Sequence, residues 1–154
     1  MNNDIKYVGI DIGGSHTKVA LVTSNYEIIN EDNVFYGNIK PNLKPSYIYE
    51  HITKYIDNLS KEIFDNIKRI AVACPGITKN NKIIGAVNLG GNSDILIKIE
   101  KKYNLPLYST NDAVAASFAQ LKKGSLINTD NAIYLGLGTG VGFSVILNKQ
   151  IFLP

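Results

Sequence analysis

The stretch "GIDIGGSHTKVALV", residues 9–22, constrains the fold more than any other part of the chain. β-Formers on both sides of a Gly-Gly pair predict two strands joined by a tight turn. Such a turn exposes successive backbone N–H groups, and glycine, which has no Cβ, lets a phosphate oxygen approach closely. Asp11 precedes the turn, where a carboxylate can hold Mg²⁺ directly or through water. The alternative is a plain hairpin turn, because Gly-Gly is a favoured turn pair.

Polar side chains around this turn strengthen the phosphate interpretation. Ser15 and Thr17 offer hydroxyl donors, and Lys18 offers a positive charge. A second stretch, "GLGTGVGFSVIL" at 136–147, repeats the pattern of strand, glycine turn and strand. Neither stretch ends its glycines in the G-K-[ST] of a Walker A loop. Neither fits the dinucleotide fingerprint, because β-formers and not a helix follow the glycines.

The segment between the two glycine stretches begins with a strand and a helix. Residues 26–37 predict a third strand, antiparallel to the second. Isoleucine and leucine at spacings of three and four predict one helix with an apolar face from residue 48 to 67. The apolar run 69–74, stopped by Pro75-Gly76, predicts a strand buried on both faces, as in a parallel sheet.

The following segment predicts two more helices around a strand. Residues 94–103 form a helical pattern, with Asp94 available as its N-cap. A strand at 105–110 leads into a helix that begins at Asn111-Asp112 and stops at Gly124. The polar stretch 125–131 is a plausible domain boundary.

Composition excludes several classes of function. The 154 residues are 45% hydrophobic and 19% charged, which fits a globular protein. The net charge of +3 is too weak to argue for a nucleic-acid partner, and we expect none. The chain has no secretory signal pattern, and no apolar run approaches the roughly 20 residues that span a bilayer. We therefore expect a cytoplasmic protein without a membrane partner. Cys74 is the only cysteine, which excludes an intrachain disulfide and a multi-cysteine zinc site within this chain. We expect Cys74 to pack as an apolar group, and His16 and His51 to be solvated or packed.

Five motifs together resemble the ROK family of sugar kinases, within the actin-like ATPase superfamily. They are "GIDIGGSHTKVALV", "VACPGI", "AVNLGG", "STNDAVAA" and "LGLGTGVG", in the family's order. The resemblance implies an α/β fold of the actin-like ATPase (ribonuclease H-like) type. Its mixed sheet would have three antiparallel first strands and flanking helices. Residues 1–127 would form the N-terminal domain, and 128–154 the opening β-hairpin of a second domain.

The resemblance also implies that the two glycine hairpins clamp the phosphates of ATP across a cleft. The first phosphate loop would comprise Asp11, Gly13, Gly14 and Ser15, with Lys18 beside it and Asp11 holding Mg²⁺ through water. The second would comprise Gly138, Thr139 and Gly140. The cofactors implied are ATP and Mg²⁺, with no zinc site within this chain.

The same resemblance assigns the sugar site. Asp112 would accept the proton of the sugar hydroxyl as it attacks the γ-phosphate, and Asn111 would hydrogen-bond the sugar. Gly76 would let the backbone approach the sugar, and Asn88 would contact it or shape its pocket. The alternatives from the residues alone are a helix cap for Asp112, a turn for Gly76 and a loop asparagine for Asn88.

Two departures from the family pattern leave functional alternatives open. Phe143 and Ser144 stand where relatives have more glycine, and the chain stops where the family continues into a second domain. Residues 131–153 are therefore expected to pack on the first domain or pair with another chain. The leading hypothesis is an ATP-dependent kinase of a hexose or N-acylhexosamine, with "NLGG" leaning towards N-acetylmannosamine. It would be seen here as its N-terminal half and as a homo-oligomer.

The competing hypotheses are a sugar-sensing module like the ROK repressors and an inactive truncated domain. The repressors carry a DNA-binding helix-turn-helix before the kinase-like part. The first strand here is expected by residue 5, which leaves no room for that element.

Overall fold

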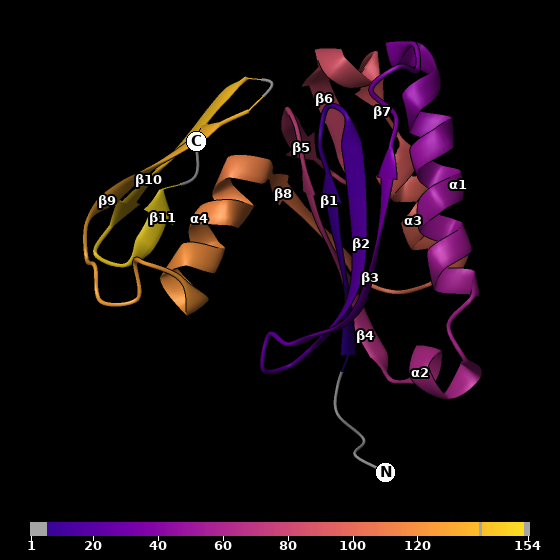
Figure 1. Cartoon of the computed structure of the whole chain (residues 1–154), viewed down its shortest axis with the longest axis horizontal. Coiled ribbons are helices and arrows are strands. Elements are labelled where there is room, and N and C mark those ends of the chain that lie inside the picture. Colours follow the sequence, from indigo (N-terminus) through magenta and orange to yellow (C-terminus); the bar gives the residue numbers. More distant parts are fainter. Residues whose placement is uncertain (1–5, 139, 153–154) are drawn as a thin grey trace. The chain divides into compact units, whose positions relative to one another are not determined.

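A five-stranded mixed sheet is the centre of the first part of the chain (Figure 1). The computed structural model describes residues 6–138 and 140–152. The strands follow the order β3-β2-β1-β4-β8. Strands β1 to β3 are antiparallel neighbours and β4 is parallel to β1, which confirms the predicted fold class. The bounds are β1 Lys6–Ile12, β2 His16–Thr23, β3 Ile28–Phe35, β4 Ile67–Cys74 and β8 Leu107–Asn111.

One apolar core joins this sheet to two helices, α1 (Lys44–Asp57) and α3 (Ile95–Tyr103), which lie side by side (Figure 1). Cys74 is buried in it, as expected. The core side chains include Val8, Ile12, Leu21, Ile52, Ile56, Ile70, Leu96 and Ile99.

The single helix predicted for residues 48–67 is wrong in its second half. Helix α1 ends at Asp57, and the short helix α2, Lys61–Asp65, follows with the Ser60 hydroxyl as its N-cap. Ile67 already belongs to β4. Isoleucine at helical spacing does not show where a helix ends and a strand begins, because β-branched residues suit strands equally well.

Strand β4 has one buried face, whereas the sequence predicted two. Ile70, Val72 and Cys74 are buried, while Arg69 and Ala71 are exposed. The predicted parallel arrangement is confirmed, since β4 pairs in parallel with β1.

A small antiparallel sheet follows β4 and lies next to the start of α1. It comprises β5 (Ile77–Lys79), β6 (Lys82–Ala86) and β7 (Gly91–Ser93), and a single 3₁₀ turn, η2 (Val87–Leu89), joins β6 to β7. A Cβ at Gly90 would come within 2.9 Å of Asn42 Cα in η1, the 3₁₀ turn Pro41–Leu43 that precedes α1. The backbone of the "NLGG" segment therefore packs directly against the backbone of η1.

The remainder of the chain forms a second compact unit, and the division falls between Ser109 and Thr110. Helix α4 (Asp112–Lys123) packs on a sheet of order β11-β10-β9. The predicted second hairpin is confirmed as β9 (Ala132–Leu137) and β10 (Val141–Leu147), and β11 (Gln150–Phe152) was not predicted. Domains with the bounds 1–127 and 128–154 remain a prediction for the whole protein. Among the described residues, no helix is long and apolar enough to cross a membrane.

Candidate functional site

The glycine turn, residues 13–15, joins β1 to β2 and is closed by its own backbone. The Gly13 N–H donates to the carbonyl oxygen of His16 across 2.8 Å. Gly13 therefore has no N–H left for a ligand, which corrects the expectation that successive N–H groups are all available. Neither Gly13 nor Gly14 has a positive φ, so left-handed backbone is not the reason for glycine at either position.

All three carbonyl groups of the glycine turn accept hydrogen bonds from the protein interior. Tyr36 Oη donates to Gly13 O across 2.6 Å, and the Tyr36 N–H donates to Ser15 O across 2.8 Å. Lys44 Nζ donates to Gly14 O across 2.8 Å. Within the described part of the chain, the N–H groups of Gly14 and Ser15 have no acceptor. The turn therefore points its carbonyls inward and retains two backbone donors for a ligand.

Tyr36 is the buried centre of this arrangement, with 1% of its surface exposed. Its hydroxyl lies 2.7 Å from His16 O and 2.9 Å from Thr17 Oγ1. Since a phenol has one proton, which goes to the carbonyls, Thr17 must be the donor to Tyr36. Burial raises the pKa of Tyr36 to about 12, the Thr17 hydrogen bond partly opposes this, and the charge of Asp11 adds to it. The hydroxyl is thus a neutral donor at physiological pH.

Thr17 does not face a ligand. It is fully buried and its hydroxyl is engaged with Tyr36. The expectation that Thr17 adds a donor to a phosphate is therefore wrong, because the second residue of β2 points into the core.

Asp11 and Lys18 are directly opposite each other on β1 and β2, and both are exposed. Opposite charges at facing positions attract, so the pair brings a carboxylate and an ammonium to the strand ends beside the turn. The described residues contain no group of three or more His, Cys, Asp or Glu side chains arranged to hold a metal. One carboxylate nevertheless fits Mg²⁺, which usually keeps several waters and takes other oxygens from a bound phosphate.

Asn88 lies against the glycine turn. A Cβ at Gly14 would come within 3.2 Å of Asn88 Nδ2, so glycine at 14 makes room for the amide of the "NLGG" segment. The structure thus brings together one residue expected to hold phosphate and one expected to contact sugar.

Gly76 occupies a turn that no other residue fits. Its φ is +81°, and a Cβ there would come within 2.5 Å of Ile84 O in β6. It follows the carboxyl end of β4, and the glycine turn follows the carboxyl end of its parallel neighbour β1. Both therefore lie at the same edge of the sheet.

In the second unit, Asn111 and Asp112 begin helix α4. The Ala113 N–H donates to Asn111 Oδ1 across 2.9 Å and lies 2.8 Å from Asp112 Oδ1. Asp112 is exposed. The capping role considered for this pair is therefore present.

The second glycine hairpin has an open tip. Gly138 N–H donates to Gly140 O across 2.9 Å, and a Cβ at either glycine would meet nothing within 4 Å. Thr139 lies outside the described residues. Phe143 is exposed, and it points away from α4 because the preceding residue, Gly142, faces that helix.

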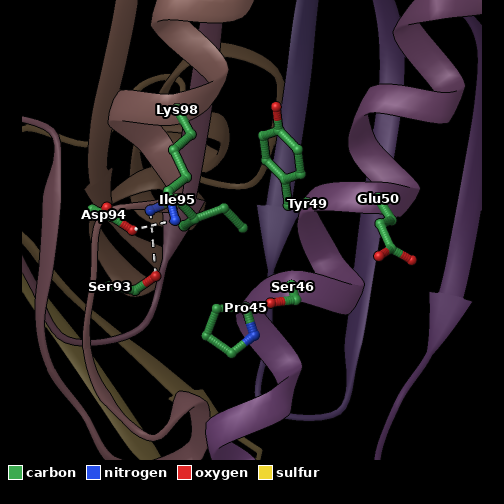
Figure 2. Close-up of a pocket in the computed structure, with 8 residues that line it drawn as sticks. All are labelled: Pro45, Ser46, Tyr49, Glu50, Ser93, Asp94, Ile95 and Lys98. Atoms are coloured by element: carbon green, nitrogen blue, oxygen red, sulfur yellow. Dashed lines mark hydrogen bonds and ion pairs between the residues drawn. The ribbon is translucent and has the colours of Figure 1, made fainter.

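A separate pocket of about 310 Å³ lies between α1 and α3 (Figure 2). Asp94 and Lys98 form an ion pair of 3.1 Å in its wall. Asp94 stands at the N-cap position but makes no side-chain cap, and Ser93 Oγ instead accepts from the Ile95 N–H. None of the residues expected to bind sugar or ATP lines this pocket.

Sequence reasoning missed Tyr36 and Lys44, the two residues that hold the glycine turn. Tyr36 was assigned only to a strand, and Lys44 lies just before Pro45 in what was predicted as a loop. No local signal marks either one, since their partners are about 20 and 30 residues away in sequence.

Among curated proteins, the chain is similar to both regulators and kinases. The Xylose repressor of Bacillus subtilis is 27% identical over 147 residues, which covers 94% of this chain and 38% of the repressor. The Glucokinase of Halalkalibacterium halodurans is 29% identical over 158 residues, covering 97% and 46%. The N-acetylmannosamine kinase of Yersinia pestis is 28% identical over 152 residues, covering 96% and 49%. The chain thus spans less than half the length of each of these relatives.

Solved structures of the same kinds share the fold. A ROK family glucokinase from Streptomyces griseus, in complex with glucose and AMPPNP, matches with a TM-score of 0.77 at 21% identity, over 96% of this chain and 46% of that one. A ROK family transcriptional regulator, a homologue of the Escherichia coli MLC protein, matches with a TM-score of 0.79 at 18% identity, over 96% and 38%. A sequence model of the ROK family matches residues 7–153. This chain therefore belongs to the ROK family.

Proposed function

We propose that the whole protein transfers the γ-phosphate of ATP to a hydroxyl of a hexose or N-acylhexosamine. The observation that carries this proposal is the glycine turn, whose carbonyls are held inward while the N–H groups of Gly14 and Ser15 remain available. Backbone N–H groups on a turn are suited to phosphate oxygens. The adjacent amide of Asn88 is suited to a sugar hydroxyl, so donor and acceptor substrates would meet at this edge of the sheet.

Asp112 is the proposed general base. It would take the proton from the attacking hydroxyl, with Asn111 binding the sugar, and a positioned base typically contributes about 10²–10⁴-fold. Gly76 and Asn88 would complete the sugar contacts. Positioning and charge stabilisation supply most of the remaining rate in phosphoryl transfer.

The proposed phosphate and metal contacts come from the two glycine hairpins. Asp11 would hold Mg²⁺ through water beside Gly13, Gly14 and Ser15, with Lys18 adding charge. The second phosphate loop would comprise Gly138, Thr139 and Gly140. ATP is the proposed donor because a structural neighbour binds AMPPNP. Since ATP is a cytoplasmic metabolite, we place the activity in the cytoplasm.

The second candidate is a sugar-binding regulator. It is favoured by the similarity to the Xylose repressor over 94% of this chain. The two functions differ in chemistry. A regulator needs the sugar contacts of Asn88 and Asn111 but neither a base nor turnover of ATP.

The test is a coupled ADP-release assay with MgATP and, in turn, glucose, mannose, N-acetylglucosamine and N-acetylmannosamine. This chain and the full-length protein are both assayed. Sugar-dependent turnover should fall by at least about 10²-fold in Asp112→Asn. The matched control is Asp94→Asn, which changes another exposed aspartate at a helix start. Turnover that survives Asp112→Asn would refute the catalytic assignment. Sugar binding by the full-length protein without turnover would favour the regulator.

A further inference from the structure

Lys44 is a buried lysine directly behind the glycine turn. It is the first residue of α1 and is only 6% exposed. Its Nζ lies 2.8 Å from Gly14 O and 5.6 Å from the centre of the Tyr36 ring. Within residues 6–138 and 140–152, no carboxylate lies within ion-pair distance of Nζ. The cation thus has a carbonyl and an aromatic face as partners, but no negative charge.

This placement is unfavourable for the protein alone. A buried ammonium group loses its hydration, and an ion pair normally compensates for that loss. The first turn of a helix also carries positive partial charge, which disfavours a further cation there. An anion bound on the outer side of the glycine turn would provide the missing negative charge.

The peptide geometry connects Lys44 to that outer side. In a trans peptide the C=O and the following N–H belong to one rigid plane and point in opposite directions. The Gly14 carbonyl shares its peptide group with the Ser15 N–H, and the Gly13 carbonyl shares its group with the Gly14 N–H. Lys44 therefore fixes the direction of the Ser15 N–H, and Tyr36 fixes that of the Gly14 N–H. A charged donor on the carbonyl also polarises the peptide and strengthens its N–H as a donor.

We propose that Lys44 and Tyr36 are the positioning residues of the phosphate loop. Each holds one peptide of the turn so that its N–H faces a phosphate group, and Lys44 adds a positive charge behind the loop. The inference rests on the proposed function, because it takes the turn to be a phosphate site. It gives a role in phosphate binding to two residues that lie outside the five family motifs of this sequence.

The test measures binding of tripolyphosphate to the chain by ¹H–¹⁵N NMR, with melting temperature as the check on folding. In the unmodified chain, the Gly14 and Ser15 amide resonances should shift on titration. Lys44→Met should weaken binding by at least about tenfold, since a hydrogen bond to a charged group is lost. In the free protein, Lys44→Met should move the Ser15 amide and Tyr36→Phe the Gly14 amide. The matched control is Lys54→Met, on an exposed lysine of the same helix.

Lys44→Gln keeps a neutral hydrogen-bond donor at this position. It is the variant to measure if Lys44→Met does not fold. We expect it to fold and to bind several-fold more weakly than the unmodified chain. Lys44 variants that fold and bind tripolyphosphate with unchanged affinity would overturn the inference and leave the proposed kinase intact. Weakened binding in a protein that phosphorylates no sugar would support the positioning role and refute the kinase. No shift at Gly14 or Ser15 in the unmodified chain would refute the phosphate assignment of the glycine turn and the positioning role with it.

Discussion

Gly142 of β10 lies directly under Ala113 of α4, where a Cβ at position 142 would come within 3.0 Å of the Ala113 Cβ. Gly142 pairs with Gly136 of β9 across the sheet. The glycines of "LGLGTGVG" thus serve two purposes. Gly136 and Gly142 are on the face that packs on the helix, whereas Gly138 and Gly140 form the open tip, for which we propose the phosphate contact.

A larger residue at Gly142 should therefore destabilise the second unit. We expect Gly142→Val to lower the free energy of unfolding by about 1–3 kcal/mol, because extra methyl groups would push α4 off the sheet. Gly140→Val is the control, since nothing lies within 4 Å of its Cβ position. Urea denaturation followed by circular dichroism measures both variants. Equal effects at the two positions would show that helix packing is not what requires glycine at 142.

Gly76 should be the least replaceable glycine of the first unit. Gly76→Ala meets both an unfavourable φ of +81° and the carbonyl oxygen of Ile84 at 2.5 Å. Gly85→Ala is a matched control, because its φ is +70° but its Cβ position is open. Left-handed strain costs roughly 1–2 kcal/mol in either variant. The overlap with Ile84 should add about 1–3 kcal/mol at position 76 alone. Denaturation midpoints of the two variants provide the comparison, and identical midpoints would contradict it.

The stability of the chain should fall at mildly acidic pH because of His51. Burial lowers the pKa of His51, while the negative charge of Asp32 acts in the opposite direction and the positive charge of Lys54 reinforces the lowering. Its Nε2 is buried without a hydrogen-bond partner among the described residues. The unfolded chain therefore binds the proton more tightly than the folded one. The stabilising contribution is complete above about pH 6.5 and is lost as the pH falls from there towards the lowered pKa.

His51→Gln should flatten this dependence. The measurement is the free energy of unfolding at intervals from pH 5 to pH 7.5, where the unmodified chain should gain stability with rising pH. His16→Gln removes an exposed imidazole and is the control. A slope that His51→Gln leaves unchanged would assign the acid sensitivity to other groups.

Local patterns predicted the elements of this fold better than they predicted the site. The hairpin around Gly13-Gly14 and helix α4 were foreseen because turn glycines and caps act over a few residues. The helix ending at Asp57 was missed, since the isoleucine spacing continues past it into β4. Spacing alone does not distinguish an apolar helix face from a buried strand.

Local patterns did not predict that Tyr36 and Lys44 hold the glycine turn. The sequence presents Lys44 as one of 16 basic residues, and its burial depends on a carbonyl 30 positions earlier. Asn88 and Gly14 are similarly remote in sequence, yet the fold brings them together. The family motifs identified residues, whereas the tertiary contacts determine which groups of those residues are available.

The outer face of the β9–β11 sheet should make the chain self-associate. Side chains alternate along a strand, so the face opposite α4 collects a continuous apolar set. Sheets with two apolar faces are normally covered on both, and α4 covers only one. Sedimentation velocity should show a weight-average mass that rises with concentration, in keeping with the homo-oligomer expected from the sequence. The exposed apolar side chains of this face are Ile133, Leu135, Leu137, Val141, Phe143, Leu147 and Phe152.

Leu135 and Phe143 pair across the two strands of this face. The double variant Leu135→Lys, Phe143→Lys should shift the chain to monomer. Melting temperature should change little, because both side chains are exposed. Lys122→Glu on α4 is the control, as it alters the charge of the same unit without touching the apolar face. Hydrogen exchange adds an independent check, since β9 and β10 amides should be protected in the oligomer. A chain that sediments as a monomer at all concentrations would refute self-association through this face.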